Sequence, residues 1–333
     1  MNISWTKYKL HLKTPFVLSY GQYDFRWSYI LTLSSEGVDG LGEATAIKYY
    51  GWTEERLDEE FSSLPSTVVD ETTINNILEK GELSPPVRNA LQCAYIDLKG
   101  KLAGEKIAEL YNIMQSGNLP TSSITITGKT IEEFEQQLQS YNWPIYKIKM
   151  GGDYDETCLQ FMRNHSDKLF RIDANAGWTI DWVQENKAEL NADYIDFIEQ
   201  PFPPDHPQLN LEVKNFIQKP IIADESCQSL ANLDHCDEYF DGVNVKIMKC
   251  GGVDRALELI QAAKARGSKI MLGCMTESSI GISHASQLLP LVDYADIDGA
   301  VLVKNDMARG VSLDKGVLQP TFIAGCGAEL INS

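Results

Sequence analysis

Leu169-Phe-Arg-Ile-Asp173 opens a pattern that repeats in Tyr194-Ile-Asp-Phe-Ile-Glu199 and in Pro220-Ile-Ile-Ala-Asp224. Each run is largely apolar and ends in an acid, and the acids are 26 (199 − 173) and 25 (224 − 199) residues apart. A strand, a helix and two connecting loops need about that length. Successive parallel strands direct their C-terminal ends to one face, which in a closed barrel is the catalytic face. The pattern therefore predicts that three carboxylates converge on one site.

The pattern extends in both directions, with lysines in place of the acids. Ile145-Tyr-Lys147-Ile-Lys149 ends 24 residues (173 − 149) before the first acid, and Val243-Asn-Val-Lys246 ends 22 residues (246 − 224) after the last. From Thr121 onward, short apolar runs alternate with helical stretches, which predicts an α/β fold of parallel β/α units closed into a barrel. The eight predicted strands cover residues 122–127, 145–150, 169–174, 194–200, 220–225, 242–248, 269–275 and 294–302.

The N-terminal part of the chain has a different pattern. Apolar and polar residues alternate over 3–12, 28–33 and 40–43, which predicts antiparallel strands with one solvated face, with turn-forming glycines from 37 to 42. Helices are predicted after Thr53 and from Pro85. Weak strands after about residue 310 are expected to return to this unit. We therefore predict an α+β capping domain over 1–115, completed by about 310–333, and a barrel domain over 116–309.

Composition limits the classes of partner. The 333 residues carry a formal net charge of −18, which argues against nucleic acid or anionic membrane as a partner. The sequence has no run of 18 apolar residues and no apolar signal core at its N-terminus. Its seven cysteines form no CxxC pair, so reduced thiols and a cytoplasmic location are expected. The expected partner is a small molecule, and the sequence is compatible with a homo-oligomer.

The three acids are candidate metal ligands. Asp173, Glu199 and Asp224 offer the hard oxygen donors that Mg²⁺ prefers, and the absence of HxH, HExxH and cysteine clusters disfavours zinc. Any one acid alone could instead cap a helix or pair with a lysine. Three acids in register, flanked by lysines in register, favour a site for one Mg²⁺ per subunit.

The lysines are candidate acid–base groups. Lys147 and Lys149 alternate along a predicted interior strand, so their side chains share one face, where two solvated lysines would be poorly placed. Two neighbouring ammonium groups are expected to lower the pKa of at least one, which suits a base near neutral pH. Lys246 should arrive from the other side of the barrel. One lysine could remove the α-proton of a carboxylate substrate while the other returns a proton.

These motifs resemble those of the enolase superfamily, in the subgroup of muconate-lactonising enzymes, o-succinylbenzoate synthases and dipeptide epimerases. The resemblance spans nearly the whole chain and implies an α+β cap over a (β/α)₇β modified TIM barrel. The resembling motifs are Lys147-Ile-Lys149, Asp173-Ala-Asn175, Glu199-Gln-Pro201, Ala223-Asp-Glu-Ser226, Asn244-Val-Lys-Ile-Met-Lys-Cys-Gly-Gly252, Gly42-Glu43-Ala and Glu277-Ser-Ser-Ile-Gly281.

The resemblance assigns a role to each matching position. It implies Mg²⁺ ligands at Asp173, Glu199 and Asp224, and acid–base catalysis by Lys149 and Lys246. Lys147 is implied to tune Lys149 and to contact the substrate carboxylate. Lys249 is a weaker candidate, because the family places the catalytic lysine first in the Lys246-Ile-Met-Lys249 motif.

The eighth predicted strand favours one reaction within the subgroup. Tyr294-Ala-Asp296-Ile-Asp298 places two aspartates at i and i+2, which would face the barrel mouth together. In the dipeptide epimerases that this chain resembles, such a pair binds the substrate's α-ammonium group. The alternative is that both are turn-forming residues before Gly299. The sequence is therefore interpreted as a dipeptide epimerase, an isomerase that inverts the α-carbon of the C-terminal residue of an L,L-dipeptide by 1,1-proton transfer through an enediolate.

Specificity is assigned to the segment from Thr14 to Arg26, which corresponds to the cap loop that closes over substrate. Members that act on Ala-Glu carry an arginine near the position of Tyr23, so a C-terminal apolar, aromatic or basic residue is expected to be preferred unless Arg26 or Lys48 enters the pocket. Ordinary packing within the cap is the alternative for its aromatic residues. These are Tyr20, Tyr23, Phe25, Tyr49 and Tyr50, and the full substrate-binding set is Lys147, Asp296, Asp298, Thr127, Tyr23 and Arg26.

Two other functions stay open. Another enolase-superfamily reaction, such as that of o-succinylbenzoate synthase or a cycloisomerase, would keep the metal and the lysines but would not need Asp296 and Asp298. A sugar-acid dehydratase is disfavoured, because the sixth and seventh strands offer no His-Asp pair. A non-catalytic ligand-binding barrel would be expected to have lost a lysine or a ligand, and none is lost.

Overall fold

Three long antiparallel strands begin the chain. The structure is a computed structural model that describes residues 1–18, 21–114 and 117–331. Its first sheet has the order β1-β2-β3, formed by β1 (Asn2–Leu18), β2 (Gly21–Ser35) and β3 (Val38–Thr45). The segment 14–26 was predicted as a loop, but its described residues are mostly strand, because pairing of β1 with β2 resumes at Phe16 and Tyr23 after a register shift. The result is a hairpin arm that extends beyond the sheet.

Helix α3 (Pro85–Ala103) packs closely on β3, and two glycines allow it. A Cβ atom on Gly40 would lie 2.1 Å from the carbonyl oxygen of Ala94, and one on Gly42 would lie 1.9 Å from that of Ala90. Of the glycines predicted to form the turn, Gly37 does so together with Glu36, where φ is positive at both positions, whereas Gly40 and Gly42 lie within β3. The other helices of this N-terminal unit are α1 (Glu54–Ser63), α2 (Glu71–Glu79) and α4 (Ile107–Leu110).

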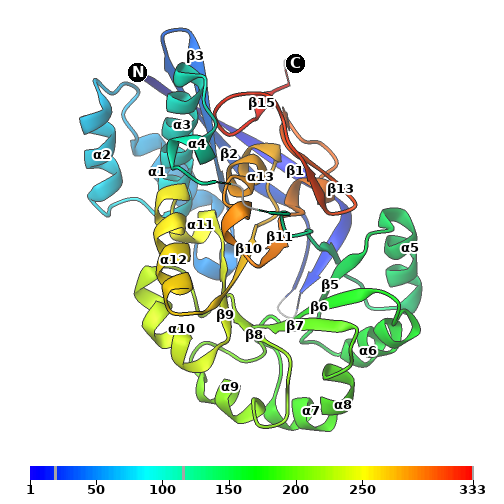
Figure 1. Cartoon of the computed structure of the whole chain (residues 1–333). Helices are drawn as coiled ribbons and strands as arrows, with labels where there is room; N and C mark the ends of the chain where they lie inside the picture. Colours follow the sequence, from blue (N-terminus) through cyan, green and yellow to red (C-terminus); the bar gives the residue numbers. More distant parts are fainter. Residues whose placement is uncertain (19–20, 115–116, 332–333) are drawn as a thin grey trace.

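Eight parallel strands then form the predicted barrel, with the order β11-β10-β9-β8-β7-β6-β5-β4. In Figure 1 helices lie around the outside of these strands, and the N-terminal strands lie across one end. The barrel strands are β4 (Ile124–Ile126), β5 (Ile145–Lys149), β6 (Leu169–Asp173), β7 (Ile195–Glu199), β8 (Ile221–Ala223), β9 (Gly242–Val245), β10 (Lys269–Gly273) and β11 (Tyr294–Asp296). The helices are α5 (Ile131–Tyr141), α6 (Asp155–Asn164), α7 (Ile180–Glu185), α8 (Lys187–Leu190), α9 (Gln208–Val213), α10 (Leu233–Tyr239), α11 (Ile247–Cys250), α12 (Val253–Ala265) and α13 (Ser279–Ser286).

Every barrel strand ends before its predicted last residue, and two end three or more residues early. Residues 294–302 were expected to be one strand, but β11 stops at Asp296 and residues Gly299–Leu302 form a short 3₁₀ helix. Likewise, β9 stops at Val245, and Lys246 is the N-cap residue of α11. Asp298 consequently has helical backbone angles and does not continue the alternation of β11.

The C-terminal segment packs against the N-terminal unit, as expected. Lys106 and Gly325 form a parallel bridge, and the backbone amide of Cys326 donates to the Asp97 carboxylate at 2.7 Å. The short strands here are β12 (Ala308–Arg309), β13 (Ser312–Asp314), β14 (Val317–Gln319) and β15 (Glu329–Leu330). The boundaries 1–115 with 310–333, and 116–309, stay a prediction.

A layer of apolar side chains inside the barrel lies beneath the predicted site. Inside the barrel, Phe197, Ile222 and Met271 form a buried apolar cluster with Tyr294 packed against it. Phe197, Ile222 and Tyr294 each lie two residues before an acid of the predicted site, so they form the layer beneath that site. Among the described residues, no helix is long and apolar enough to span a membrane.

Candidate active site

The three acids of the repeated pattern converge at the C-terminal ends of their strands. Asp173 and Glu199 end β6 and β7, Asp224 directly follows β8, and all three side chains are buried. One carboxylate oxygen from each lies within 4.8 Å of the others. Register explains part of this arrangement, because Asp173 pairs with Glu199 across neighbouring strands. Three hard oxygen donors at this separation form a plausible binding set for one divalent cation.

Their mutual repulsion appears in the pKa of Glu199. Burial raises this pKa to about 7, with a further contribution from the charge of Asp173. Asp173 itself is held ionised, because Lys149 and Lys147 outweigh the effect of burial and lower its pKa to about 2. A cation bound between the acids would relieve this repulsion, so the residues present suit a metal ion.

Lys149 and Lys246 reach the acid cluster from different sides of the barrel. In the sheet order, β5 and β9 are separated by β6, β7 and β8. The Nζ atom of Lys149 lies 2.5 Å from Asp173 Oδ2, and that of Lys246 lies 2.7 Å from Asp224 Oδ2. Both lysines line the same cavity. Two ammonium groups thus face one space from opposite walls.

Lys147 differs from the expectation for neighbouring lysines. Its Nζ atom lies 3.1 Å from Asp173, 2.7 Å from Glu199 and 2.8 Å from Asp296. Burial lowers the pKa of Lys147, but these carboxylates raise it more, so the net shift is upward. The lowering expected for at least one of the two lysines does not occur at Lys147, because Asp296, Glu199 and Asp173 surround its ammonium group with negative charge.

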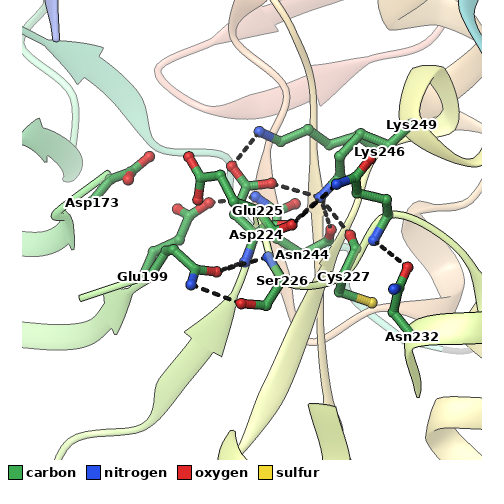
Figure 2. A network of polar contacts seen from close by, with 12 residues as sticks. Asp173, Glu199, Asp224, Glu225, Ser226, Cys227, Asn232, Asn244, Lys246 and Lys249 are labelled. Atoms are coloured by element: carbon green, nitrogen blue, oxygen red, sulfur yellow. Dashed lines mark hydrogen bonds and ion pairs between the residues drawn. The ribbon is translucent and has the colours of Figure 1, made fainter. Parts of the chain in front are cut away.

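Lys249 forms hydrogen bonds with Asp224 and does not line the cavity. Its ammonium group donates to Asp224 Oδ1 at 2.6 Å and to the backbone carbonyls of Asp224, Asn244 and Cys227. Figure 2 shows Lys246 and Lys249 both reaching Asp224. With four acceptors around it, Lys249 has no donor left for a substrate, so we assign it to holding the loop that carries Asp224.

Asp296, which ends β11, and Asp298, two residues later, both line the cavity but have different contacts. Asp296 accepts from Ser123 Oγ at 2.6 Å and pairs with Lys147. Asp298 accepts from the backbone amide of Thr125 at 2.6 Å. Burial and the charge of Asp296 raise the pKa of Asp298 to about 7. No cation of the described residues pairs with Asp298, which leaves it suited to a cationic ligand.

The hairpin arm and the loop after β3 cover the cavity. Tyr23 and Arg26 lie in its wall, and the guanidinium carbon of Arg26 is 3.5 Å from the centre of the Tyr23 ring. Tyr23 also reaches the barrel, with 3.2 Å between its hydroxyl and Thr276 Oγ1. Tyr49 and Tyr50 line the same cavity. Tyr20 lies outside the described residues.

Two predicted pocket residues lie elsewhere. Thr127 lines a neighbouring hollow, where its backbone exchanges hydrogen bonds with the side chain of Gln137; Thr125, two residues earlier, lines the cavity. Phe25 also lines an adjacent hollow. The side chains of a strand alternate between two faces, but β4 ends at Ile126, so extrapolating the alternation to Thr127 fails.

Several further residues lie at the site without a role predicted from the sequence. Asn244 donates to Glu199 Oε1 at 2.6 Å, and Arg171 lies beneath the site, donating to Ser123 Oγ at 3.3 Å. Both could have been identified from the alternation of side chains along a strand, because each lies two residues before a predicted site residue. Glu225 also lines the cavity, and burial together with the charge of Asp224 raises its pKa to about 8.

Comparisons with known proteins agree with this architecture. The model of the "enolase C-terminal domain-like" family matches residues 129–330, which is more than half of the chain. The chain belongs to the enolase superfamily. The family resemblance inferred from the motifs and the predicted capped barrel are confirmed.

Enolase-superfamily relatives match along their whole length. An L-Ala-D/L-amino acid epimerase of Flavobacterium johnsoniae is 37% identical over 337 residues, covering 99% of this chain and 100% of the relative. An enzyme of the same name from Maribacter sp. is 38% identical, with 99% of each chain covered. The solved dipeptide epimerase of Methylococcus capsulatus, in complex with Mg and L-Arg-D-Lys, has a TM-score of 0.89 and 25% identity, covering 98% of this chain and 99% of that chain.

Proposed function

We propose that this chain is a Mg²⁺-dependent dipeptide epimerase, an isomerase that inverts the α-carbon of the C-terminal residue of a dipeptide. The observation that carries the proposal is the placement of Lys149 and Lys246 on opposite walls of one cavity, beside three convergent carboxylates. The full-length similarity to amino acid and dipeptide epimerases supports the same reaction.

Asp173, Glu199 and Asp224 would hold one metal ion. When bound, Mg²⁺ would supply positive charge that stabilises the negative charge gained by the substrate's carboxylate group on deprotonation. Asn244 holds Glu199 through a hydrogen bond of 2.6 Å, and Lys249 holds Asp224. Such contacts around the ligands fix their orientation before a metal arrives.

The two lysines perform the proton transfers. One lysine, as the neutral amine, takes the α-proton from its side of the α-carbon, and the other, as the ammonium, donates a proton from the opposite side. The configuration inverts because removal and return occur on opposite faces, and no redox cofactor is needed. Lys147, held by three carboxylates, keeps its charge and would contact the substrate carboxylate.

Asp298 favours a dipeptide over the other substrates of this superfamily. Its carboxylate lines the cavity without a paired cation among the described residues, so it can accept a free α-ammonium group. The substrates of an o-succinylbenzoate synthase or a cycloisomerase have no cation for this position. An anionic group facing such a substrate would be left unpaired, which disfavours those reactions.

Arg26 changes the expected side-chain preference. The sequence predicted poor acceptance of acidic residues, because no arginine lies at Tyr23. We propose that Arg26 supplies this charge instead: its guanidinium group stacks on Tyr23 in the cavity wall, and no carboxylate of the described residues pairs with it. An acidic or neutral polar C-terminal side chain can meet this cation, whereas a basic one would be repelled.

A dipeptide library incubated in D₂O tests the function. Epimerisation through α-proton removal should introduce deuterium at the α-carbon of the C-terminal residue, detected as a mass increase, with both epimers appearing. The N-acetyl form of each reactive dipeptide serves as a matched control and should react at least about 30-fold more slowly, because it lacks the cation that faces Asp298. Equal turnover of free and N-acetyl dipeptides would contradict the assignment.

A further inference from the structure

The barrel is closed between its first and last strands by side chains as well as by backbone. Among the described residues, β4 and β11 share one isolated bridge, between Ser122 and Ala295, and no continuous ladder. Two hydrogen bonds between backbone amides and side chains connect the same two segments next to this bridge. The backbone amide of Ile297 donates to Ser122 Oγ at 3.0 Å, and that of Thr125 donates to Asp298 at 2.6 Å.

Both carboxylate oxygens of Asp296 accept a hydrogen bond at this seam between the first and last strands. Its Oδ1 atom accepts from Ser123 Oγ at 2.6 Å, and its Oδ2 atom accepts from Lys147 Nζ at 2.8 Å. Asp298 differs, because its contacts come from Thr125, whose amide donates to Oδ2 at 2.6 Å, and from the Cys274 thiol, 3.9 Å from Oδ1, and no lysine or arginine of the described residues pairs with it. The two aspartates therefore offer unequal capacity to a cationic ligand.

The hydroxyl of Ser123 is directed toward Asp296 by a buried arginine. Arg171 donates to Ser123 Oγ at 3.3 Å and to the carbonyl of Ala295 at 2.5 Å, while its Nε pairs with Asp196 at 3.0 Å. Its guanidinium group also lies over the rings of Phe197 and Tyr294. Because the arginine can only donate, it occupies a lone pair of Oγ, and the hydroxyl proton is left for Asp296.

We propose that Ser123 and Arg171 are positioning residues for the epimerase, which hold Asp296 against Lys147. The line of contacts runs from Arg171 through Ser123 and Asp296 to Lys147, which faces the substrate carboxylate. Lys147 lies among the carboxylates of Asp173, Glu199 and Asp296. If Ser123 no longer holds Asp296 in place, the ammonium group of Lys147 can move toward the other two. This inference rests on the proposed function and extends it to residues beneath the cavity.

Ser123→Ala tests the proposal while leaving the seam backbone intact, because the Ser123 amide still donates to Ala295. The matched control is Ser122→Ala, which removes the neighbouring seam hydroxyl that does not contact Asp296. Each variant is assayed with a reactive L-Ala dipeptide and with an analogue in which a propionyl group replaces the L-alanyl residue. The analogue therefore lacks only the α-ammonium group. The discrimination ratio is kcat/KM for the dipeptide divided by that for the analogue.

Ser123→Ala should lower kcat by roughly 10- to 100-fold and should change the discrimination ratio less than Asp298→Asn does, while Ser122→Ala keeps kcat near the wild-type value. Asp298→Asn should instead reduce the discrimination ratio. A Ser123→Ala enzyme with normal kcat, or with a ratio reduced as far as in Asp298→Asn, would overturn the inference.

Crystal structures of wild type and Ser123→Ala provide a readout that does not depend on turnover. The inference expects Asp296 to leave Lys147 in the variant, and an unmoved Asp296 would overturn it. A wild-type enzyme that exchanges no dipeptide α-proton would refute the proposed function, and the crystal structures would still decide the positioning role of Ser123.

Discussion

At the scale of single residues, the contacts distinguish the lysines proposed to move protons from the lysines proposed to keep their charge. Lys147 and Lys249 are each surrounded by several oxygen acceptors, whereas Lys149 and Lys246 line the cavity and each pair with one carboxylate. A lysine held by several acceptors is poorly suited to release its proton, because loss of the proton would leave those acceptors unpaired. Because the contacts of Lys147 and Lys249 hold their protons, Lys149 and Lys246 are the lysines that we propose as acid–base groups.

Single replacement of either catalytic lysine should abolish epimerisation but not all proton exchange. Lys149→Ala and Lys246→Ala should each lower the rate of epimerisation by about 100- to 10,000-fold, the usual contribution of one acid–base group. Each variant should still exchange the α-proton of one epimer with solvent, and the two variants should differ in which epimer exchanges. NMR in D₂O on each epimer separately measures this.

Lys269→Ala is the control for this pair, since Lys269 begins β10 at the opposite end of the barrel and is exposed. It should behave as wild type. Normal epimerisation by Lys149→Ala or Lys246→Ala would remove that lysine from the mechanism.

Asp298 should make the reaction sensitive to pH near neutrality. Burial and the charge of Asp296 raise the pKa of Asp298 to about 7, so the carboxylate is protonated below that pH and ionised above it. Only the ionised form attracts the substrate ammonium group, and kcat/KM for free dipeptides should therefore fall as the pH decreases through about 7. The Asp298→Asn enzyme should have a lower kcat/KM and should lack this change between pH 6 and 8; retention of the change in the variant would exclude Asp298 as its cause.

At the scale of secondary-structure elements, the hairpin of β1 and β2 carries Tyr23 and Arg26, the residues proposed to set specificity. The strands continue past the cap sheet, and Phe16 stacks on Tyr23 with 5.3 Å between ring centres. Tyr23 in turn supports Arg26 and contacts Thr276 of the barrel. A paired hairpin holds these side chains over the cavity more firmly than an open loop would.

Arg26→Met should change the preference for the C-terminal side chain. Loss of a charged hydrogen bond of roughly 1.5–3 kcal/mol should lower kcat/KM for L-Ala-L-Glu by about 10- to 100-fold, with little change for L-Ala-L-Met. Lys48→Met is the matched control, because Lys48 lines only the adjacent hollow. Equal losses for both dipeptides, or the same selectivity change in Lys48→Met, would show that Arg26 does not meet the side chain.

A second element-scale contact joins the N-terminal sheet to the barrel. Glu43 of β3 is buried and accepts hydrogen bonds from the backbone amides of Ser278 and Gly281, at the start of α13, and from two serine hydroxyls. The carboxylate therefore caps a barrel helix from another part of the chain. This contact lies beside the loop that forms one wall of the cavity, at Met275 and Thr276.

Glu43→Ala should destabilise the protein, because the amides of Ser278 and Gly281 lose their acceptor in a buried environment. We expect the free energy of unfolding to fall by about 2–5 kcal/mol, measured by denaturant titration. Glu59→Ala, at an exposed position of α1, should change it by less than about 0.5 kcal/mol. Equal effects of the two variants would show that the contact contributes nothing to stability.

At the scale of the whole molecule, metal binding should stabilise the folded state. Only the folded barrel brings Asp173, Glu199 and Asp224 together, so a cation held there binds the native state in preference to the unfolded chain. Mg²⁺ at about 100 times its Kd should add about 2.7 kcal/mol. Thermal unfolding of chelator-treated protein, with and without added Mg²⁺, measures the effect alongside activity.

Asp224→Asn is the control for the metal, and it should lose most of the Mg²⁺-dependent rise in Tm. Chelator treatment should abolish the activity of the wild-type enzyme, and added Mg²⁺ should restore it. Full activity after exhaustive chelation would contradict the metal assignment.

The sequence alone determined the barrel, its cap and the identity of the central acids and lysines. This was possible because the apolar runs and their terminal residues repeat at the spacing of β/α units, a local pattern that survives without knowledge of contacts. The alternation of side chains along a strand also relates Arg171 to Asp173 and Asn244 to Lys246, but it does not determine which residue each side chain contacts.

Only the tertiary structure decided those partners. Ser123 and Asp296 are 173 residues apart in sequence, and they meet because the first and last barrel strands close against each other. Arg26 enters the cavity because the hairpin pairs beyond the sheet, and Lys147 has a raised pKa because three strands place carboxylates around it. Each outcome depends on which elements pack together, and the free energy of those non-local contacts is not written in any one segment of the chain.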